Sequence, residues 1–345
     1  MKRLQKLVSL MIMLGMIISL TACASDESST SQDTGSSDTT TQTEEKTALR
    51  IGYFPNITHA QALVAKDQKK VETAVGDGVE VTWTSFNAGP AEIEALFAGE
   101  IDLGYIGPIP AITSNIQSSG DVSIVSNATN GGAVLVTRKD LVLDSPADLA
   151  GKKVAIPQIG NTQHVNLLKI LSENELRPDT DGGDVEVKAV ENSNVQQLMD
   201  AGEIDAALVP EPWGTVLEKE IGANVLLDYK DVWMEGDYSV AVVICSKDFK
   251  EAHPDIVKKF LAAHKEATLF INDNAEEAKS IINKQIEETS GKAIAPEVLD
   301  SAFSRLVVTD TINEESITQF AEISKQEGLI DDLPGENLID TSFAE

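Results

Sequence analysis

Positive charge, cysteine and histidine are scarce in this sequence. Its 345 residues include 27 Lys and Arg against 56 Asp and Glu, with two cysteines and four histidines. The formal net charge of −29 argues against nucleic acid or an anionic lipid surface as a partner. Because no Cys/His cluster has the spacing of a metal site, the sequence predicts no metal and no cofactor.

Familiar catalytic motifs are missing as well. The chain contains no G-x-S-x-G elbow, no Walker loop, no G-x-G-x-x-G and no H-E-x-x-H. We therefore expect a binding protein and not an enzyme. An extracellular enzyme that assembles a Ser-His-Asp constellation from distant residues remains an alternative.

The first residues predict export and lipidation. A positively charged start precedes an apolar run, 7–20, that is too short to span a bilayer comfortably. The run leads through Thr21 and Ala22 into Cys23, an arrangement that resembles the bacterial lipobox. We expect a signal peptide over 1–22 and a lipid anchor on Cys23, which places the protein at the extracytoplasmic face of the cell membrane. Removing 1–22, with its three positive and no negative charges, takes the net charge from −29 to −32.

A polar tether is predicted after the anchor. Residues 24–47 contain one alanine and no larger apolar side chain, so they cannot offset the entropy of ordering, and 23–48 is expected to be a disordered linker. If Cys23 carries lipid, Cys245 is the one remaining thiol and no intramolecular disulfide can form. Its apolar setting in 241–245 predicts a buried strand position and not a nucleophile.

An internal repeat predicts two similar α/β lobes. Segments 79–110 and 185–213 each open with Val-Glu-Val, continue through a helical pattern to Ala-Gly-Glu-Ile-Asp, and end in a second strand. Gly99 and Gly202 fall where a helix end favours a left-handed residue. A strand, a loop and a helix precede each copy, and this alternation predicts mainly parallel sheets flanked by helices.

The repeat also sets the expected domain boundaries. We assign 49–137 plus 246–345 to lobe 1 and 138–245 to lobe 2, with a hinge of two crossings formed by strands at 133–137 and 239–245. The C-terminal part is predicted to be helical scaffold that packs onto lobe 1. Its periodic segments begin after His253, Asn274, Ala295 and Asn313.

Six loop segments are candidates for the ligand site, because ligands of open parallel sheets bind beyond the carboxyl ends of the strands. None of them contains Lys or Arg, and most are expected to run from a strand into a helix whose start presents free N–H groups. Several such starts converging on one cleft would bind a strong-acid anion such as a sulfonate; ordinary turn and cap chemistry is the alternative for each loop. The segments are 54–59, 87–90, 105–108, 129–132, 158–163 and 210–213.

Individual side chains in these loops allow two interpretations. Trp213 either lines the cleft or belongs to the buried stripe of its helix, and Glu211 either grips a polar group of the ligand or caps that helix. His59 and His164 occupy similar points of two related loops. Hydrogen bonding or helix packing is expected of them, since a metal site would need more ligands.

Four segments resemble a known family: GYFPNITHAQALVA, FNAGPAEIEALFAGEIDLGYIGP, GKKVAIPQIGNTQ and VPEPW. They are similar to the solute-binding lipoproteins of nitrate/sulfonate/taurine-type ABC importers, over about Leu49 to Ile271. The resemblance implies the two-lobed type II periplasmic-binding-protein fold, a small anionic solute of the aliphatic sulfonate or taurine type, and permease and ATPase subunits as partners. It implies that the ligand sits between Asn56, Thr58, Asn87, Gly107, Asn130, Asn161, Thr162 and Glu211. The loops themselves add His59, Gln163 and Trp213 as candidates.

The same resemblance leaves a second ligand class open. Relatives also bind heterocyclic vitamin precursors of the thiamine-pyrimidine or flavin type. A flat ring would be held by Trp213 and Tyr105, with Glu211 as the hydrogen-bond acceptor. Ile109 stands where the family often has a smaller residue, which affects the expected shape of the pocket.

Overall fold

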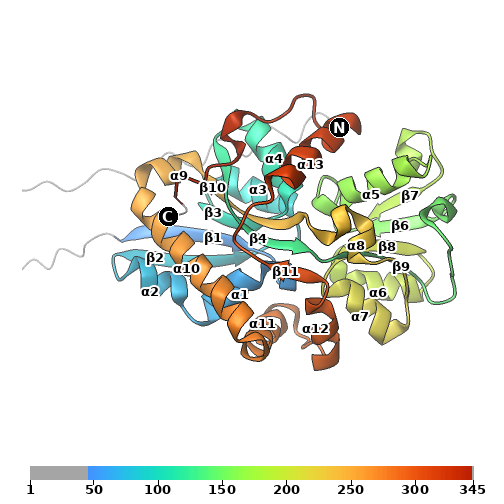
Figure 1. Ribbon diagram of the computed structural model, residues 1–345, viewed down its shortest axis with the longest axis horizontal. Helices are drawn as coiled ribbons and strands as arrows, with labels where there is room; N and C mark the ends of the chain where they lie inside the picture. Colours follow the sequence, from blue (N-terminus) through green and yellow to red (C-terminus); the bar gives the residue numbers. More distant parts are fainter. Residues whose placement is uncertain (1–45, 344–345) are drawn as a thin grey trace, which may run out of the picture. The chain divides into compact units, whose positions relative to one another are not determined.

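The computed structural model describes residues 46–343, so Cys23, the predicted signal peptide and nearly all of the predicted tether lie outside the described residues. The described part contains a six-stranded sheet, in the order β11-β4-β10-β3-β1-β2, and a five-stranded sheet, in the order β7-β6-β8-β5-β9 (Figure 1). The strands are β1 Thr47–Tyr53, β2 Val79–Ser85, β3 Leu103–Ile106, β4 Val122–Gly131, β5 Ala133–Thr137, β6 Lys153–Ile156, β7 Glu186–Ala189, β8 Ala206–Pro210, β9 Asn224–Leu227, β10 Ser239–Ser246 and β11 Leu306–Val308.

Helices cover both sheets. They are α1 Ala60–Asp67, α2 Lys70–Val75, α3 Gly89–Phe97, α4 Pro108–Gln117, α5 Thr162–Glu173, α6 Asn192–Asp200, α7 Trp213–Ile221, α8 Tyr229–Val232, α9 Lys247–Ala252, α10 Pro254–Asp273, α11 Ala275–Ser290, α12 Pro296–Phe303 and α13 Glu314–Gln326.

The repeat predicted from the sequence is a repeat of structure. In the first sheet β1 pairs in parallel with β2 and β3, and in the second β6 pairs in parallel with β7 and β8. Gly99 and Gly202 both adopt φ of 70° just after α3 and α6, as the helix-end pattern predicted. The mainly parallel pairing expected for each lobe holds for these strands and not for the rest. Strands β4, β5, β9, β10 and β11 pair antiparallel. Of these, β4, β5 and β10 flank the segments that run between the sheets, and β9 and β11 are edge strands.

The strands place the crossings differently from the expected boundaries. β5, which we assigned to lobe 1, belongs to the five-stranded sheet. β10 lies in the six-stranded sheet, although we assigned all of it except Ser246 to lobe 2. The chain leaves the first sheet at Gly131 and Gly132, with φ of 73° and 79°, and returns through 228–238. The return segment holds Met234, Glu235 and Gly236 at φ of 44°, 52° and 84°. Left-handed backbone thus marks both crossings, and the alternation of strands alone could not locate it.

The C-terminal helices begin where the sequence predicted them. α10, α11, α12 and α13 start directly after His253, Asn274, Ala295 and Asn313. We call the six-stranded sheet with the helices on it the first half, and the five-stranded sheet with its helices the second half. α10 packs on α1 and α2, as expected for scaffold of the first half. α12 packs instead against α7, and α13 against both α4 and α5, so these two helices contact both halves (Figure 1). The prediction that the C-terminal part packs on one lobe was therefore incomplete.

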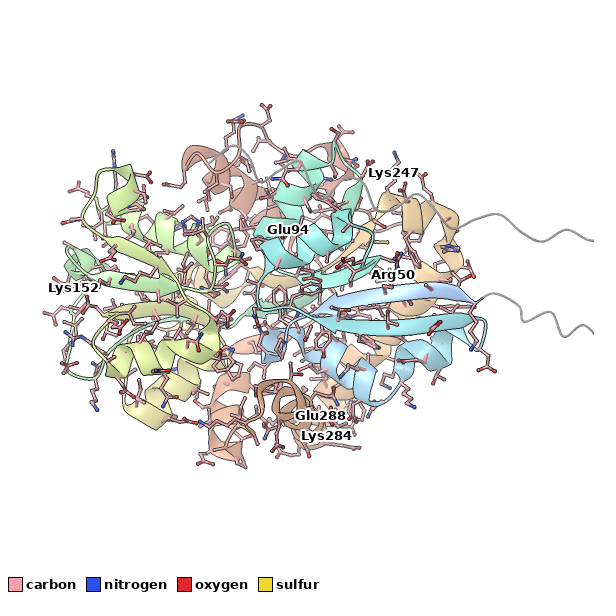
Figure 2. All side chains as sticks on the ribbon, turned by 180° about the vertical axis from the view of Figure 1, so that it is seen from behind. Arg50, Glu94, Lys152, Lys247, Lys284 and Glu288 are labelled. Atoms are coloured by element: carbon pink, nitrogen blue, oxygen red, sulfur yellow. The ribbon has the colours of Figure 1, made fainter. Side chains whose placement is uncertain are left out.

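Charged side chains such as Glu94 and Lys284 are exposed on the outer faces of the helices (Figure 2). One ion pair of this kind joins Lys284 to Asp67 at 2.7 Å. Within residues 46–343 no helix is long and apolar enough to cross a membrane, and no group of three or more His, Cys, Asp and Glu could hold a metal ion.

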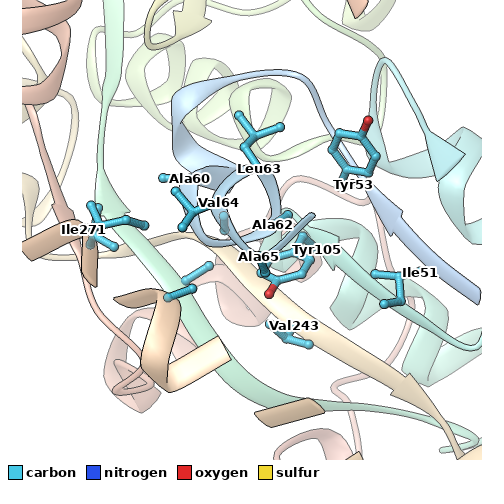
Figure 3. Close-up of a cluster of buried hydrophobic side chains, with 14 of the residues drawn as sticks. Ile51, Tyr53, Ala60, Ala62, Leu63, Val64, Ala65, Tyr105, Val243 and Ile271 are labelled. Carbon is cyan, nitrogen blue, oxygen red and sulfur yellow. The ribbon is translucent and has the colours of Figure 1, made fainter. Parts of the chain in front are cut away.

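Aliphatic and aromatic side chains fill the space between sheet and helices. In the first half Ile51, Tyr105 and Val243 of the sheet meet Leu63 and Val64 of α1 (Figure 3). Cys245 lies in the same cluster with no exposed area, and burial raises the pKa of its thiol to about 12. The thiol is therefore inert at neutral pH, as its apolar setting predicted.

Candidate functional site

A pocket lies where the carboxyl ends of six strands meet. The loops that follow β1, β2 and β3 of the first sheet face those that follow β6, β7 and β8 of the second. About 400 Å³ of empty space lies between them, part of it open to solvent. The lining consists of Phe54, Asn56, Thr58, His59, Asn87, Ala88, Gly89, Gly107, Pro110, Pro157, Asn161, Thr162, Gln163, Asn192, Pro210 and Val240. We call this the inner pocket. Its position is the one that ligands of parallel sheets favour.

The inner pocket brings together eight of the eleven residues named from the sequence. These are Asn56, Thr58, His59, Asn87, Gly107, Asn161, Thr162 and Gln163. Trp213 lines a neighbouring outer pocket, and Asn130 and Glu211 line neither. Asn130 lies within β4, where its side chain donates to Asp237 at 3.0 Å and accepts from Asn127 at 3.0 Å. That loop differs from the others because its strand continues into the first crossing, at Gly131 and Gly132, and no helix follows it.

Two histidines hold the loops of the two halves in the same way. The Nδ1 atom of His59 accepts from the backbone N–H of Phe54 at 3.1 Å, and Nδ1 of His164 accepts from Gly160 at 3.2 Å. In each ring Nε2 therefore carries the proton of the neutral form. Burial lowers the pKa of His59 to about 3 and also lowers that of His164, whose fall is opposed by the nearby Asp181. Both histidines are thus neutral and form hydrogen bonds within their own loops, as expected. His59 also lines the pocket.

Helix starts point at the inner pocket from both halves. Ala88, Gly107 and Asn161 are the residues that precede α3, α4 and α5, and all three line it. Asn161 accepts from the backbone N–H of His164 at 2.8 Å, and Asn56 accepts from that of Thr58 at 3.2 Å, so each side-chain oxygen caps its own turn. Helix starts carry partial positive charge, and the lining contains no Lys or Arg. The pocket is therefore positively polarised without a cationic side chain.

The two halves touch at Gly107 and Thr162. A Cβ atom added at Gly107 would lie 2.3 Å from Oγ1 of Thr162, so any other residue at 107 would require the Thr162 side chain to shift. The Thr162 hydroxyl is buried and has no hydrogen-bond partner among the described residues. The same holds for Oδ1 of Asn192. Buried polar atoms normally have partners, which makes these two candidates for ligand contacts.

Asn192 is the clearest lining residue that we did not name from the sequence. It begins α6, in the loop after β7. The signal was present, because this loop follows the Val-Glu-Val strand of the second repeat just as the Asn87 loop follows that of the first.

An outer pocket adjoins the inner one and shares Phe54, Asn56, Asn87 and Asn192 with it. Its further lining includes Glu191 and Trp213, and it holds about 720 Å³ of space, part of it open to solvent. Nδ2 of Asn87 donates to Oε1 of Glu191 at 3.1 Å, which joins the two halves at the boundary between the pockets.

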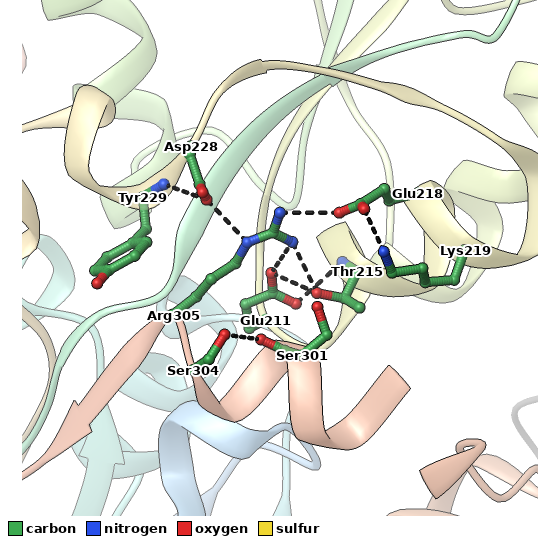
Figure 4. A network of polar contacts seen from close by, with 9 residues as sticks. All are labelled: Glu211, Thr215, Glu218, Lys219, Asp228, Tyr229, Ser301, Ser304 and Arg305. Carbon is green, nitrogen blue, oxygen red and sulfur yellow. Dashed lines mark hydrogen bonds and ion pairs between the residues drawn. The ribbon is translucent and has the colours of Figure 1, made fainter. Parts of the chain in front are cut away.

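Glu211 is buried and points along its own helix. Its carboxylate accepts from the backbone N–H of Thr215 at 3.0 Å and from the Thr215 hydroxyl at 2.9 Å. Nη1 of Arg305 donates to the same carboxylate at 3.0 Å (Figure 4). Burial raises the pKa of Glu211, although Arg305 and Thr215 act against that rise. Of the two interpretations left open, the structure therefore favours the helix cap, with a partner that the sequence did not indicate.

Arg305 gathers three carboxylates. Besides Glu211 it contacts Glu218 through Nη2 at 2.8 Å and Asp228 through Nε at 2.8 Å (Figure 4). Its side chain is 11% exposed, against none for Glu211. Arg305 lies between α12 and β11, in a region that we had assigned to scaffold, and no local pattern in the sequence pointed to it.

A second buried carboxyl lies under α3. Glu92 has no exposed area, and both of its carboxyl oxygens lack a hydrogen-bond partner among the described residues. Cβ atoms added at Gly52 and Gly104 would lie 2.2 and 2.1 Å from its Oε1, so these two facing glycines of β1 and β3 make room for it. Burial raises the pKa of Glu92 well above its ordinary value. Burial without a compensating partner thus favours the uncharged form of this carboxyl.

Two bacterial proteins resemble this chain over most of the described part. The taurine-binding periplasmic protein of Escherichia coli is 30% identical over 210 residues, which are 59% of this chain and 63% of that protein. This chain thus covers less than two thirds of that relative. A putative aliphatic sulfonates-binding protein of Bacillus subtilis is 23% identical over 76% of this chain and 77% of its own length.

Solved structures share the fold. The alkanesulfonate-binding protein SsuA of Xanthomonas axonopodis pv. citri, bound to MOPS, superposes with a TM-score of 0.69 at 21% identity, covering 87% of this chain and 98% of that one. The aliphatic sulphonate binding protein SsuA of Escherichia coli gives a TM-score of 0.68 at 22% identity, over 85% and 92%. At this identity the likeness establishes the periplasmic-binding-protein fold. The model of the NMT1-like family matches residues 42–284, and the chain therefore belongs to the NMT1-like family.

Proposed function

We propose that this protein is the extracytoplasmic substrate-binding component of an ABC importer and that it captures a small organic anion of the sulfonate class in the inner pocket. The observation that carries the proposal is the chemistry of the lining. Helix starts from both halves and neutral hydrogen-bonding side chains converge there, and no lining residue is Lys or Arg. Related proteins named for taurine and aliphatic sulfonates support the same class.

A sulfonate suits this lining because of its charge and geometry. Its group is ionised at every physiological pH and has three acceptor oxygens. The His59 Nε2–H, the Thr162 hydroxyl and the side-chain amide of Asn56 are donors that fit such an acceptor. Fixed N–H dipoles in a cavity of low dielectric constant stabilise negative charge better than they do in water.

The heterocycle alternative is less well supported by the positions of its proposed residues. Tyr105 has no exposed area, and its hydroxyl oxygen lies 2.9 Å from Nδ1 of His264, inside the core of the first half. It therefore cannot stack on a ring in the pocket. Glu211, the proposed acceptor, is engaged with Thr215 and Arg305.

The two halves are proposed to move as lobes about the crossings at Gly131 and Gly132 and at 228–238. The second half would comprise the chain between these crossings, and the first half the remainder of the described residues. Because each half supplies part of the pocket, closure would bury the ligand between them. Permease and ATPase subunits are the proposed partners, and binding without turnover is the proposed activity.

A panel of ligands tests the function. Thermal shift and calorimetry with ethanesulfonate, taurine, nitrate and a thiamine-type pyrimidine should show binding of the sulfonates. Thr162→Val removes the buried hydroxyl at nearly constant volume and should weaken ethanesulfonate binding by about 1–3 kcal/mol. Thr113→Val, on the partly exposed face of α4, is the matched control and should have no effect. Binding of the pyrimidine in place of every anion would overturn the proposal.

Lipid attachment at Cys23 is a separate proposal, since the residue lies outside those that the structure describes. It is supported by the lipobox-like segment. Wild-type protein should incorporate a labelled fatty acid. It should also stay with washed membranes, because lipidation of Cys23 would supply the several acyl chains that stable attachment needs. Cys23→Ala should do neither. Wild-type protein that washes freely from the membrane would refute the anchor.

A further inference from the structure

We propose that Arg305 is a positioning residue for the anion site: it holds the Glu211 carboxylate turned back along α7 and compensates its charge, so that the adjoining pocket accepts an anion. The inference rests on the proposed function, because a buried carboxylate repels an anionic ligand and not a neutral one. It gives a role in specificity to a residue that lines neither pocket.

The backbone at Glu211 runs along the pocket wall. Pro210, just before it, lines the inner pocket, and Trp213, two residues later, lines the outer one. The backbone N–H of Glu211 donates to the carbonyl of Gly132 at 2.7 Å, which fixes this turn against the first crossing. Glu211 thus lies between residues that line the two pockets, so the direction and the compensation of its carboxylate matter for an anion bound there.

Arg305 reaches this carboxylate from the other half of the protein. It directly precedes β11, which pairs with β4 in the six-stranded sheet, whereas its partners Glu211, Glu218 and Asp228 belong to the chain of the five-stranded sheet. A Cβ atom added at Gly131 would lie 3.1 Å from the Arg305 carbonyl oxygen. The arginine thus sits at the crossing itself, where movement of the halves displaces atoms least. We infer that its contacts persist in open and closed forms and are not a latch.

The charges around Glu211 leave Arg305 as its compensating group. Within the described residues the hydrogen-bond and ion-pair partners of the carboxylate are Thr215 and Arg305. Glu218 on the same helix is negative and pairs with Lys219 at 2.6 Å, and Asp228 approaches the guanidinium from the opposite side. Ser301 of α12 and Ser304, which follows that helix, lie nearby and carry no charge (Figure 4).

Loss of Arg305 should therefore make anion binding depend on pH. In Arg305→Gln an ionised Glu211 lies near the anion site without a compensating cation, and protonation of Glu211 removes the repulsion. A sulfonate keeps its charge throughout, and His59, with a pKa of about 3, stays neutral above pH 6. A change in the affinity of this variant with pH would then reflect the protonation of Glu211. Wild-type affinity should be nearly flat over the same range.

Calorimetric titration of ethanesulfonate at pH 6, 7.5 and 9 tests this. We expect the affinity of Arg305→Gln to fall by about tenfold or more between pH 6 and 9, the scale of one uncompensated charge nearby. The double variant Arg305→Gln/Glu211→Gln should recover flat, near wild-type affinity. Arg138→Gln is the matched control, because Arg138 pairs with Asp140 and Asp205 and lines neither pocket; it should match the wild type.

Two results would overturn the proposal. One is a loss in Arg305→Gln that is equal at all pH values and is not rescued by the double variant, which would make Arg305 purely structural. The other is unchanged binding in Arg305→Gln. If that variant does not fold, Glu211→Gln alone decides, since it should bind ethanesulfonate as well as or better than the wild type, and a loss would refute the charge argument. Wild-type protein that binds no anion would instead refute the proposed function.

Discussion

Glu92 and Glu211 are both buried at the beginning of a helix beside the pocket, one in each half, yet their surroundings differ. Glu211 has Arg305 and Thr215 as partners, and Glu92 has two glycines and no partner among the described residues. A buried carboxyl must either be compensated or give up its charge. The protein uses the first solution where the chain crosses between the sheets and the second under α3.

The largest effect on stability is expected at Glu211, the carboxylate that Arg305 compensates. Arg305→Gln leaves Glu211 buried without its cation and should lower the free energy of unfolding by about 3–5 kcal/mol, the cost of removing one member of a buried ion pair. Urea denaturation measures the loss. The double variant with Glu211→Gln should recover part of it, and strictly additive losses would show that the two residues are not coupled.

The second prediction concerns Glu92, the carboxyl without a partner, which should make the free energy of unfolding depend on pH. Because the folded state holds the Glu92 proton above the pH at which the unfolded chain releases it, stability is greatest below the unfolded pKa and falls as pH rises toward the folded pKa. The slope can reach about 1.4 kcal/mol per pH unit for one group. Urea denaturation from pH 5 to 8 should show this slope reduced in Glu92→Gln. Glu94→Gln, exposed on the same helix, should keep it, and equal slopes in both variants would remove Glu92 from the account.

These same residues show how much of the fold and the site could be predicted from the sequence. The repeat predicted the helix that carries Glu92, and the loop at 210–213 predicted the helix that follows Glu211. Strand ends with Gly, Asn and Pro predicted most of the pocket lining. Periodicity indicates which face of an element is buried, and local motifs indicate where turns lie. Neither reports a partner 94 positions away, which is the separation of Arg305 from Glu211. Nor does a glycine in a strand reveal that a carboxyl occupies the space where its side chain would be, as at Gly52 and Gly104.

A smaller loss is expected from filling the space that Glu92 occupies. Gly104→Ala places a methyl group 2.1 Å from the Glu92 Oε1 and should cost about 1–3 kcal/mol through overpacking. In a Glu92→Ala background the same change should cost much less, because the oxygen is gone. Thermal denaturation of the four proteins of this cycle gives the coupling. Equal costs in both backgrounds would mean that Gly104 is needed for another reason.

The smallest effect should come from Glu211→Gln alone. Arg305 keeps Glu218 and Asp228, and the amide oxygen still accepts from Thr215, so we expect a loss of about 1 kcal/mol in stability. Affinities for ethanesulfonate and taurine should change alike, because the carboxylate does not face the ligand. A larger loss for taurine would show that Glu211 reads the ammonium group.

The central claim is that an anion binds among helix starts without a cationic side chain, and a crystal structure of the protein with ethanesulfonate tests it most directly. We predict the sulfonate group in the inner pocket, with its oxygens within hydrogen-bond distance of Thr162, Asn161 and Asn56 and no Lys or Arg in contact. A sulfonate held by a lysine or arginine, or bound outside this pocket, would contradict the account.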